Sequence, residues 1–165
     1  MLLPYLKEFI HRNPHISISI ECQSTNETLK LLDDDKIDIG LIGKPASLKT
    51  FNFYYLDNIE DIFVTTKDYL RNLSARGVKK SEILQNSTLM LLDKGNMTRK
   101  YIDDYLQENQ IHVKDSIDIS NMDLLIDFAK IGVGVACVIK SIVSKELADG
   151  TLIEIPLGIP IHKRE

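Results

Sequence analysis

The sequence predicts an α/β fold in which strands and amphipathic helices alternate along its 165 residues. Apolar residues at every second position, as in Ile16, Ile18 and Ile20, are typical of a half-buried strand, whereas apolar residues three and four positions apart are typical of a helix. Three times along the chain, a predicted strand leads through a short polar loop into a helix and then into another strand. Because crossovers of this kind join parallel strands, we expect largely parallel pairing.

The first element is a helix over residues 2–12, because Leu2, Leu6 and Phe9 share one helical face. The helix is expected to end before Pro14, since the residue that precedes a proline disfavours the helical conformation. No strand precedes this helix. In a chain that otherwise alternates, we expect an opening strand to belong to a longer protein.

A strand–helix–strand unit is predicted over residues 16–42. Ser24 and Glu27 fit the capping box, in which the serine hydroxyl accepts from the N–H of the third helical residue and the glutamate reaches back to the cap. The helix that follows is expected to bury Leu29 and Leu32. The expected elements are a strand over 16–21, a helix over 25–34 and a strand over 37–42.

The rest of the chain continues the alternation of strands and helices. Ser81 is expected to cap one helix, and Ser120 with Asp123 is expected to cap another. Gly132 is expected to end that second helix before an apolar strand. Residues 51–65 form either two strands or one bent strand. The remaining elements are helices over 68–73 and 81–86, a strand over 88–92, a helix ending near 109, a strand over 115–119, a helix over 121–131, a strand over 133–139, a helix over 141–148 and a strand over 152–155.

Composition and charge exclude several classes of protein. The formal net charge is −4, from 20 Lys and Arg against 24 Asp and Glu, so we expect no direct contact with nucleic acid. No apolar run approaches the roughly 18 residues of a membrane-spanning helix, and charged Lys7 and Glu8 argue against a signal peptide. Cys22 and Cys137 are expected to be buried free thiols. These features predict a reduced, cytoplasmic setting without membrane contact.

Signatures of catalysis and of cofactor binding are missing from the sequence. It contains no G-x-S-x-G elbow, no Walker loop, no G-x-G-x-x-G and no H-E-x-x-H motif. The four histidines do not have the spacing of metal ligands. We therefore expect no catalytic residue, no metal and no cofactor.

Polar residues occupy three predicted helix N-termini that follow strands. In an open α/β sheet, ligands bind beyond the carboxyl ends of the strands, and the unpaired N–H groups of a helix N-terminus favour an anion. Because Ser24 and Ser120 are expected to cap their own helices, Thr25 and Thr98 are the stronger candidates. Arg99 either clamps a carboxylate or is a solvated residue. The candidate ligand-binding residues are Ser24, Thr25, Asn96, Met97, Thr98, Arg99 and Asn121.

Five segments, taken together in their order and spacing, carry the pattern of a known family. They are Leu2 to Phe9 followed by Asn13-Pro14, Leu32 to Ile42, Gly95 to Ile111, Ile131 to Val135, and Glu146 to Leu152. With these segments, the chain resembles the effector-binding domain of LysR-type transcriptional regulators over nearly its whole length. The resemblance implies that Thr25 contacts the effector from one lobe, that residues 96–99 form the contact loop of the other lobe, and that Asn121 lies close by.

The same resemblance implies a fold like that of type II periplasmic binding proteins, with two α/β lobes joined by crossover strands and a ligand cleft between them. The family's first strand, its winged helix-turn-helix and its C-terminal helix have no counterpart in this sequence. We therefore expect a domain trimmed at both ends. The lobes would be residues 1–65 with 140–165 for lobe I, and residues 66–139 for lobe II.

As a function, the resemblance implies a ligand-sensing regulatory domain. A small anionic metabolite would close the two lobes, and the change would reach a homodimer interface and, through it, DNA-binding domains elsewhere in the full protein. Two alternatives remain. One is an enzyme on the same fold, such as a prephenate-dehydratase-like domain, for which the pair Thr98-Arg99 fits but Lys100 stands where that family has an aromatic residue. The other is a solute-binding receptor, against which the missing signal peptide counts.

Overall fold

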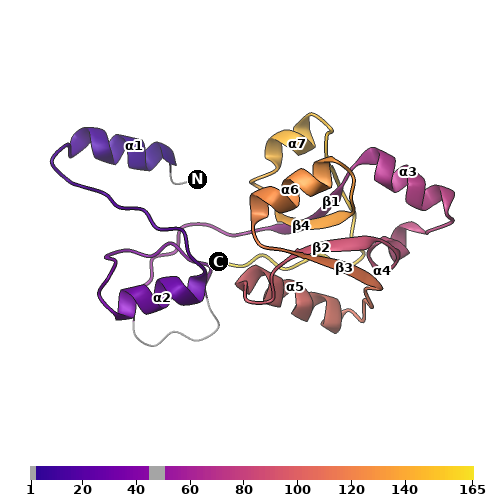
Figure 1. The fold of residues 1–165 in the computed structure, drawn as a ribbon, viewed down its shortest axis with the longest axis horizontal. Helices are drawn as coiled ribbons and strands as arrows, with labels where there is room; N and C mark the ends of the chain where they lie inside the picture. The colour runs from indigo at the N-terminus through magenta and orange to yellow at the C-terminus, as the bar shows by residue number, and fades with distance from the viewer. Residues whose placement is uncertain (1–2, 45–50) are drawn as a thin grey trace.

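The computed structural model describes residues 3–44 and 51–165. A five-stranded sheet with helices on both faces forms the main body, and α1 (Leu3–Arg12) and α2 (Thr25–Asp33) lie to one side of it (Figure 1). The C-terminus lies between α2 and the sheet (Figure 1). Both helices were expected from the sequence, although Leu2 lies outside the described residues.

The sheet has the strand order β3-β2-β4-β1-β5 and is mixed. β2 pairs in parallel with β3 and β4, whereas β1 pairs antiparallel with β4 and β5. The expectation of largely parallel pairing is therefore confirmed around β2 and wrong around β1. The neighbours of β1 in the sheet are distant in sequence, so the crossover rule does not fix its direction. The strands are β1 (Asp61–Thr65), β2 (Thr88–Leu92), β3 (Asp115–Ile119), β4 (Val135–Ile139) and β5 (Ile153–Glu154).

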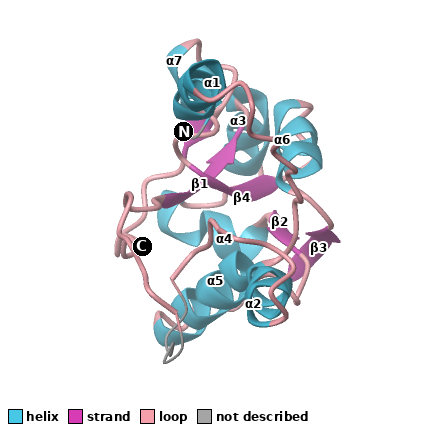
Figure 2. Cartoon of the chain, turned by 90° about the vertical axis from the view of Figure 1, so that its left-hand side faces the viewer, coloured by secondary structure: helices cyan, strands magenta, loops and turns pink. Residues whose placement is uncertain are grey.

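Helices cover both faces of this sheet. α4 and α5 lie on one face, α6 and α7 lie on the other, and α3 lies at one end (Figures 1 and 2). Within the described residues, no helix is long and apolar enough to span a bilayer. The helices are α3 (Lys67–Ala75), α4 (Ile83–Asn86), α5 (Met97–Glu108), α6 (Met122–Lys130) and α7 (Ser144–Ala148), with a 3₁₀ turn at Lys80–Glu82.

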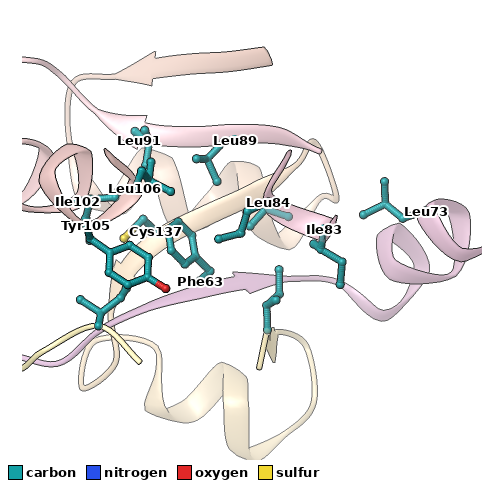
Figure 3. Packing of buried hydrophobic residues seen from close by; sticks show 13 residues of the cluster. Phe63, Leu73, Ile83, Leu84, Leu89, Leu91, Ile102, Tyr105, Leu106 and Cys137 are labelled. Carbon is teal, nitrogen blue, oxygen red and sulfur yellow. The ribbon is translucent and has the colours of Figure 1, made fainter. Parts of the chain in front are cut away.

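Each face of the sheet has its own apolar core, because side chains alternate between the two faces along a strand. Phe63 of β1 and Cys137 of β4 belong to the core under α4 and α5 (Figure 3). The next residue along each strand, Val64 and Val138, belongs to the core under α6 and α7. All five residues of β1 are buried, so this strand is central to the body.

The strands expected over 16–21 and 37–42 are absent. Both segments pair with no strand among the described residues, and most of their apolar side chains face solvent: Ile20 is 71% exposed and Ile39 is 87% exposed. A strand is stabilised by cross-strand pairing and by packing of one face. Neither segment has the pairing, and residues 37–42 lie against α2, with Gly40 beside Thr28 and Leu32, rather than against a sheet. The alternating apolar pattern is therefore present in both segments, but neither segment forms a strand.

The same missing sheet explains two further differences. Leu29 and Leu32 of α2 are only half-buried, because no sheet lies beneath them. Cys22 is exposed rather than buried, while Cys137 is buried as expected.

Two expected helix caps are wrong. Ser81 lies inside the 3₁₀ turn Lys80–Glu82, so its hydroxyl caps no helix there. The helix expected to begin after Ser120 is capped one residue later, by Asn121, whose side chain accepts from the N–H of Leu124 at 2.9 Å. Asparagine and serine are about equally good caps, so the sequence alone does not separate them.

Three elements expected in lobe I belong to the sheet body. β1 pairs with β4, and β5 pairs with β1. Leu147 of α7 packs against the core shared by β1, β4 and α6. These elements therefore lie with residues 66–139.

Candidate functional site

The first turn of α5 lies where β2 ends. After Leu92, the N–H of Asp93 donates to the carbonyl of Ile119, at the end of the neighbouring strand β3, over 3.2 Å. Asn96 then caps α5 by accepting from the N–H of Thr98 at 2.8 Å. The backbone N–H groups of Met97 and Arg99 have no acceptor among the described residues, which leaves two donors at the positive end of the helix dipole.

The first turn of α6 lies at the same edge of the sheet. β2 and β3 are parallel neighbours in register from Thr88 and Asp115 to Leu92 and Ile119, so their carboxyl ends lie side by side. α5 follows β2 on one face, and α6 with its cap Asn121 follows β3 on the other. Adjacent strands whose connections leave to opposite faces are the arrangement at which open α/β sheets bind ligands.

Arg99 is buried in the sheet body. The residue is 7% exposed, and its Nε donates to Oδ1 of Asp103 at 2.8 Å. Its Nη1 donates to the carbonyl of Leu92 at 2.9 Å and to Oδ1 of Asp118 at 2.5 Å. Burial alone lowers the pKa of Arg99, but its hydrogen bonds to the two aspartates outweigh burial and the pKa is raised. Three acceptors therefore already bind the Arg99 guanidinium, which the sequence analysis considered as a possible partner for a ligand carboxylate.

Thr98 belongs to a cluster that the sequence did not reveal. Its Oγ1 accepts from Nη2 of Arg164 at 2.8 Å. Arg164 in turn clamps Asp61 through Nε–Oδ2 at 2.6 Å and Nη2–Oδ1 at 3.0 Å. The Arg164 guanidinium carbon also lies 5.9 Å from the ring centre of Tyr101, within cation–π range.

One feature of the sequence is a signal for this cluster: Asp61 stands directly before the apolar run Ile62 to Val64. In the structure Asp61 is 2% exposed, and an aspartate is rarely buried that deeply without a cationic partner. The partner, Arg164, is 103 positions away, so the sequence does not identify it.

Ser24 and Thr25 lie on α2, apart from the sheet edge. The Ser24 hydroxyl accepts from the N–H of Glu27 at 3.3 Å, and the Glu27 carboxylate accepts from the N–H of Ser24 at 3.3 Å, so the expected capping box is confirmed. Thr25 is half-buried, and its hydroxyl has no partner among the described residues. The structure thus brings Asn96, Met97, Thr98, Arg99 and Asn121 to one edge, with Ser24 and Thr25 on a separate helix.

α2 lies on the side of the body where the chain ends (Figures 1 and 2). The N–H of Lys44 donates to the carbonyl of Glu165 at 2.8 Å, and their side chains form an ion pair. Glu165 follows the clamp residue Arg164 directly. The segment that carries Thr25 is therefore joined to the segment that contacts Thr98.

The described residues, 3–44 and 51–165, carry shallow surface hollows away from this edge of the sheet. One shallow hollow lies on α1 around Leu6 and Ile10, and another lies between α6 and α7 around Ile126 and Ile142. Neither is lined by a predicted ligand-binding residue. Within those two ranges, no three His, Cys, Asp or Glu side chains gather as metal ligands would.

Sequence comparison identifies one family. The profile described as the LysR substrate binding domain matches residues 1–165. The uncharacterised HTH-type transcriptional regulator YeiE of Escherichia coli K12 is 22% identical over 156 residues, which are 94% of this chain and 52% of that protein. The HTH-type transcriptional activator CmpR of Synechocystis is 24% identical over 164 residues, which are 96% of this chain and 52% of that protein. The chain thus spans about half the length of these relatives.

Solved structures show the same fold. The regulatory domain of CcmR from Synechocystis PCC6803, in complex with 2-PG, has a TM-score of 0.81 at 17% identity, covering 99% of this chain and 78% of that one. The effector binding domain of QuiR in complex with shikimate has a TM-score of 0.78 at 15% identity, covering 99% and 77%. The bromide-bound regulatory domain of HypT from Salmonella typhimurium has a TM-score of 0.74 at 17% identity, covering 99% and 79%.

The family match over the whole chain and the shared fold lead to one conclusion. The chain belongs to the family of LysR substrate-binding domains, the effector-binding part of LysR-type transcriptional regulators, and has their type II periplasmic-binding-protein-like fold.

Proposed function

We propose that this domain senses a small anionic metabolite, which binds at the first turns of α5 and α6 and is contacted from α2 by Thr25. The observation that carries the proposal is the group of unused donors at the start of α5. The N–H groups of Met97 and Arg99 have no acceptor among the described residues, and the helix dipole adds positive potential there. An anion is the ligand that such donors favour.

Side chains at this edge strengthen the case for an anion. A threonine hydroxyl has one donor and two acceptor sites, and Thr98 uses an acceptor site for Arg164. Its O–H has no acceptor among the described residues and can donate to a ligand. Nη1 of Arg164 has no acceptor among the described residues. These groups add a hydroxyl donor and a guanidinium N–H donor beside the two backbone donors, while the charge of Arg164 is already paired with Asp61.

The structural neighbours support a small ligand of this kind. Related regulatory domains are described in complex with 2-PG, with shikimate and with a bromide ion. We take from them the class of ligand, not its identity.

The wider role follows from the family. We propose a homodimer that uses the exposed apolar face of α1, where Tyr5 is 73% exposed, Phe9 45% and Ile10 47%. Ligand binding would change the arrangement of two lobes, one around α2 and one around the sheet, and DNA would be contacted only by another part of the full protein. We place this regulator in the cytoplasm and assign it no catalysis.

Isothermal titration calorimetry with 2-PG, shikimate and bromide tests the proposal. We expect at least one of them to bind, and Thr98→Ala to weaken that binding about tenfold through the loss of one hydrogen bond to a charged ligand. Thr151→Ala, at an exposed threonine after α7, is the matched control and should bind like the unaltered chain. Equal affinity of the Thr98→Ala variant would show that the site is assigned wrongly, and binding of none of the three would contradict the proposal that the domain senses a small anion of this class.

A further inference from the structure

Arg164 joins three segments that are far apart in sequence. Its guanidinium holds Asp61 at the start of β1 and donates to Thr98 in the first turn of α5. Its own backbone pairs with Ile59, whose N–H donates to the Arg164 carbonyl at 2.6 Å and whose carbonyl accepts from the Arg164 N–H at 3.0 Å. The chain enters the sheet body through Ile59 and leaves it through Arg164.

The segment that carries Arg164 is held against α5 along its length. The hydroxyl of Tyr105 donates to the carbonyl of Ile159 at 2.6 Å, and the hydroxyl of Tyr101 donates to the carbonyl of His162 at 2.7 Å. Between them, Ile161 is 8% exposed and packs in the core under α5. With the Arg164–Thr98 bond, three side-chain hydrogen bonds join this segment to one helix.

From this geometry we infer that Arg164 is a positioning residue of the effector site: it fixes the first turn of α5 to the paired segments at Ile59 and Arg164. A ligand that engages Thr98 then acts on the connections between the sheet body and the rest of the chain. The use of this link in sensing rests on the proposed function, but the link itself does not. Asp61 serves to hold the guanidinium in place.

An arginine is required for this role. The planar guanidinium presents Nε and Nη2 to one carboxylate as a fork and still has a second Nη2 hydrogen for Thr98. A lysine carries one nitrogen on a flexible stem, so it retains the charge beside Asp61 without fixing both partners. Arg164→Lys therefore keeps the positive charge beside Asp61 but removes the fork geometry of the guanidinium.

Hydrogen–deuterium exchange without ligand tests the link. We expect Arg164→Lys and Asp61→Asn to speed exchange about tenfold at the hydrogen-bonded amides of Thr98 and Lys100 at the start of α5 and at Ile59, since each variant loses a charge-assisted hydrogen bond. Lys163→Gln is the matched control: the Lys163 side chain is 59% exposed and, within the described part of the chain, its ammonium pairs with Glu60 alone, at 3.0 Å. This variant should leave exchange in α5 unchanged.

A double-mutant cycle gives the decisive outcome. Thr98→Val removes the other end of the link, and its effect on exchange at Ile59 should be several-fold smaller when Arg164 is already lysine. Additive effects of the two changes, or faster exchange in Arg164→Lys that is confined to residues 59–65 and 161–165, would overturn the inference. A failure of 2-PG, shikimate or bromide to bind would leave these exchange results unaffected, so the two proposals fail separately.

Discussion

Arg99 in the first turn of α5 and Asp118 near the end of β3 form an ion pair with Nη1 and Oδ1 2.5 Å apart. Through it, the start of α5 is fixed to β3, the strand beside the one that leads into this helix. The bond from the same nitrogen to the carbonyl of Leu92 adds β2. One guanidinium therefore aligns the two strand ends at which the candidate site lies.

Replacing Arg99 should destabilise the domain. Arg99→Ala leaves Asp103, Asp118 and the Leu92 carbonyl without their donor, but the side chains of Asp103 and Asp118 are 47% and 42% exposed, so water compensates in part. We expect a loss of about 2 kcal/mol in the free energy of unfolding, measured by urea denaturation.

The matched control for that loss is Arg71→Ala in α3. Arg71 pairs with Asp68 three residues away, but the two side chains are 70% and 80% exposed, so we expect a change within about 0.5 kcal/mol. Equal losses at Arg71 and Arg99 would show that the buried position of Arg99 contributes nothing.

Gly134 should not tolerate a side chain. A Cβ at this position would lie 2.3 Å from the carbonyl oxygen of Thr88, which is backbone and cannot move aside alone. We expect Gly134→Ala to lower the free energy of unfolding by about 3 kcal/mol, because the start of β4 must shift away from β2. Gly158→Ala, where no atom lies within 4 Å of the new Cβ, should change stability by less than about 0.5 kcal/mol.

Glu60 should make stability depend on pH. Hydrogen bonds from Lys163 and then from Lys140 lower the pKa of Glu60 below its ordinary value of 4.5. The unfolded chain therefore takes up the proton first as the pH falls, so the contribution of Glu60 is present above about pH 4.5 and is lost as the pH falls through the lower, folded value.

The measurement is the free energy of unfolding of the unaltered chain minus that of Glu60→Gln, followed from pH 7 to pH 3. We expect this difference to shrink below about pH 4.5. A flat difference for Glu60→Gln over this range would contradict the lowered pKa.

The two cysteines should differ sharply in reactivity. Cys22 is exposed, whereas Cys137 is 3% exposed in β4, and burial followed by the nearby charge of Asp61 raises the pKa of its thiol well above 9.0. We expect one thiol per native chain to react rapidly with a disulfide reagent, and the second only at the rate of unfolding. With Cys22→Ser, rapid reaction should disappear; if it persists, Cys137 is accessible.

The sequence predicted the features that depend on neighbouring residues. The strands 88–92 and 115–119 begin and end where expected, and the capping box of Ser24 and Glu27 is present. These features come from local alternation and from hydrogen bonds over three residues. The polar first turns of α5 and α6 were likewise found from their position after strands.

Features that depend on distant residues were not predicted. The segments 16–21 and 37–42 alternate like strands, but a strand forms only against a partner, and alternation does not supply one. The direction of β1 depends on its pairing with β4, far along the chain, and the clamp between Asp61 and Arg164 joins residues 103 positions apart. Arg99 was expected near a ligand or solvent, because a pattern of residue types does not show that three acceptors already surround it.

The contact between Lys44 and Glu165 has a further consequence. The part of the chain that carries α2 is joined to the sheet body covalently before Ile59 and a second time by this pair, between Lys44 and the residue after Arg164. Two attachments allow far fewer mutual orientations than one. For the ligand that we propose between Thr25 and Thr98, much of the orientational entropy would already be removed, and more of its contact energy would be available for affinity.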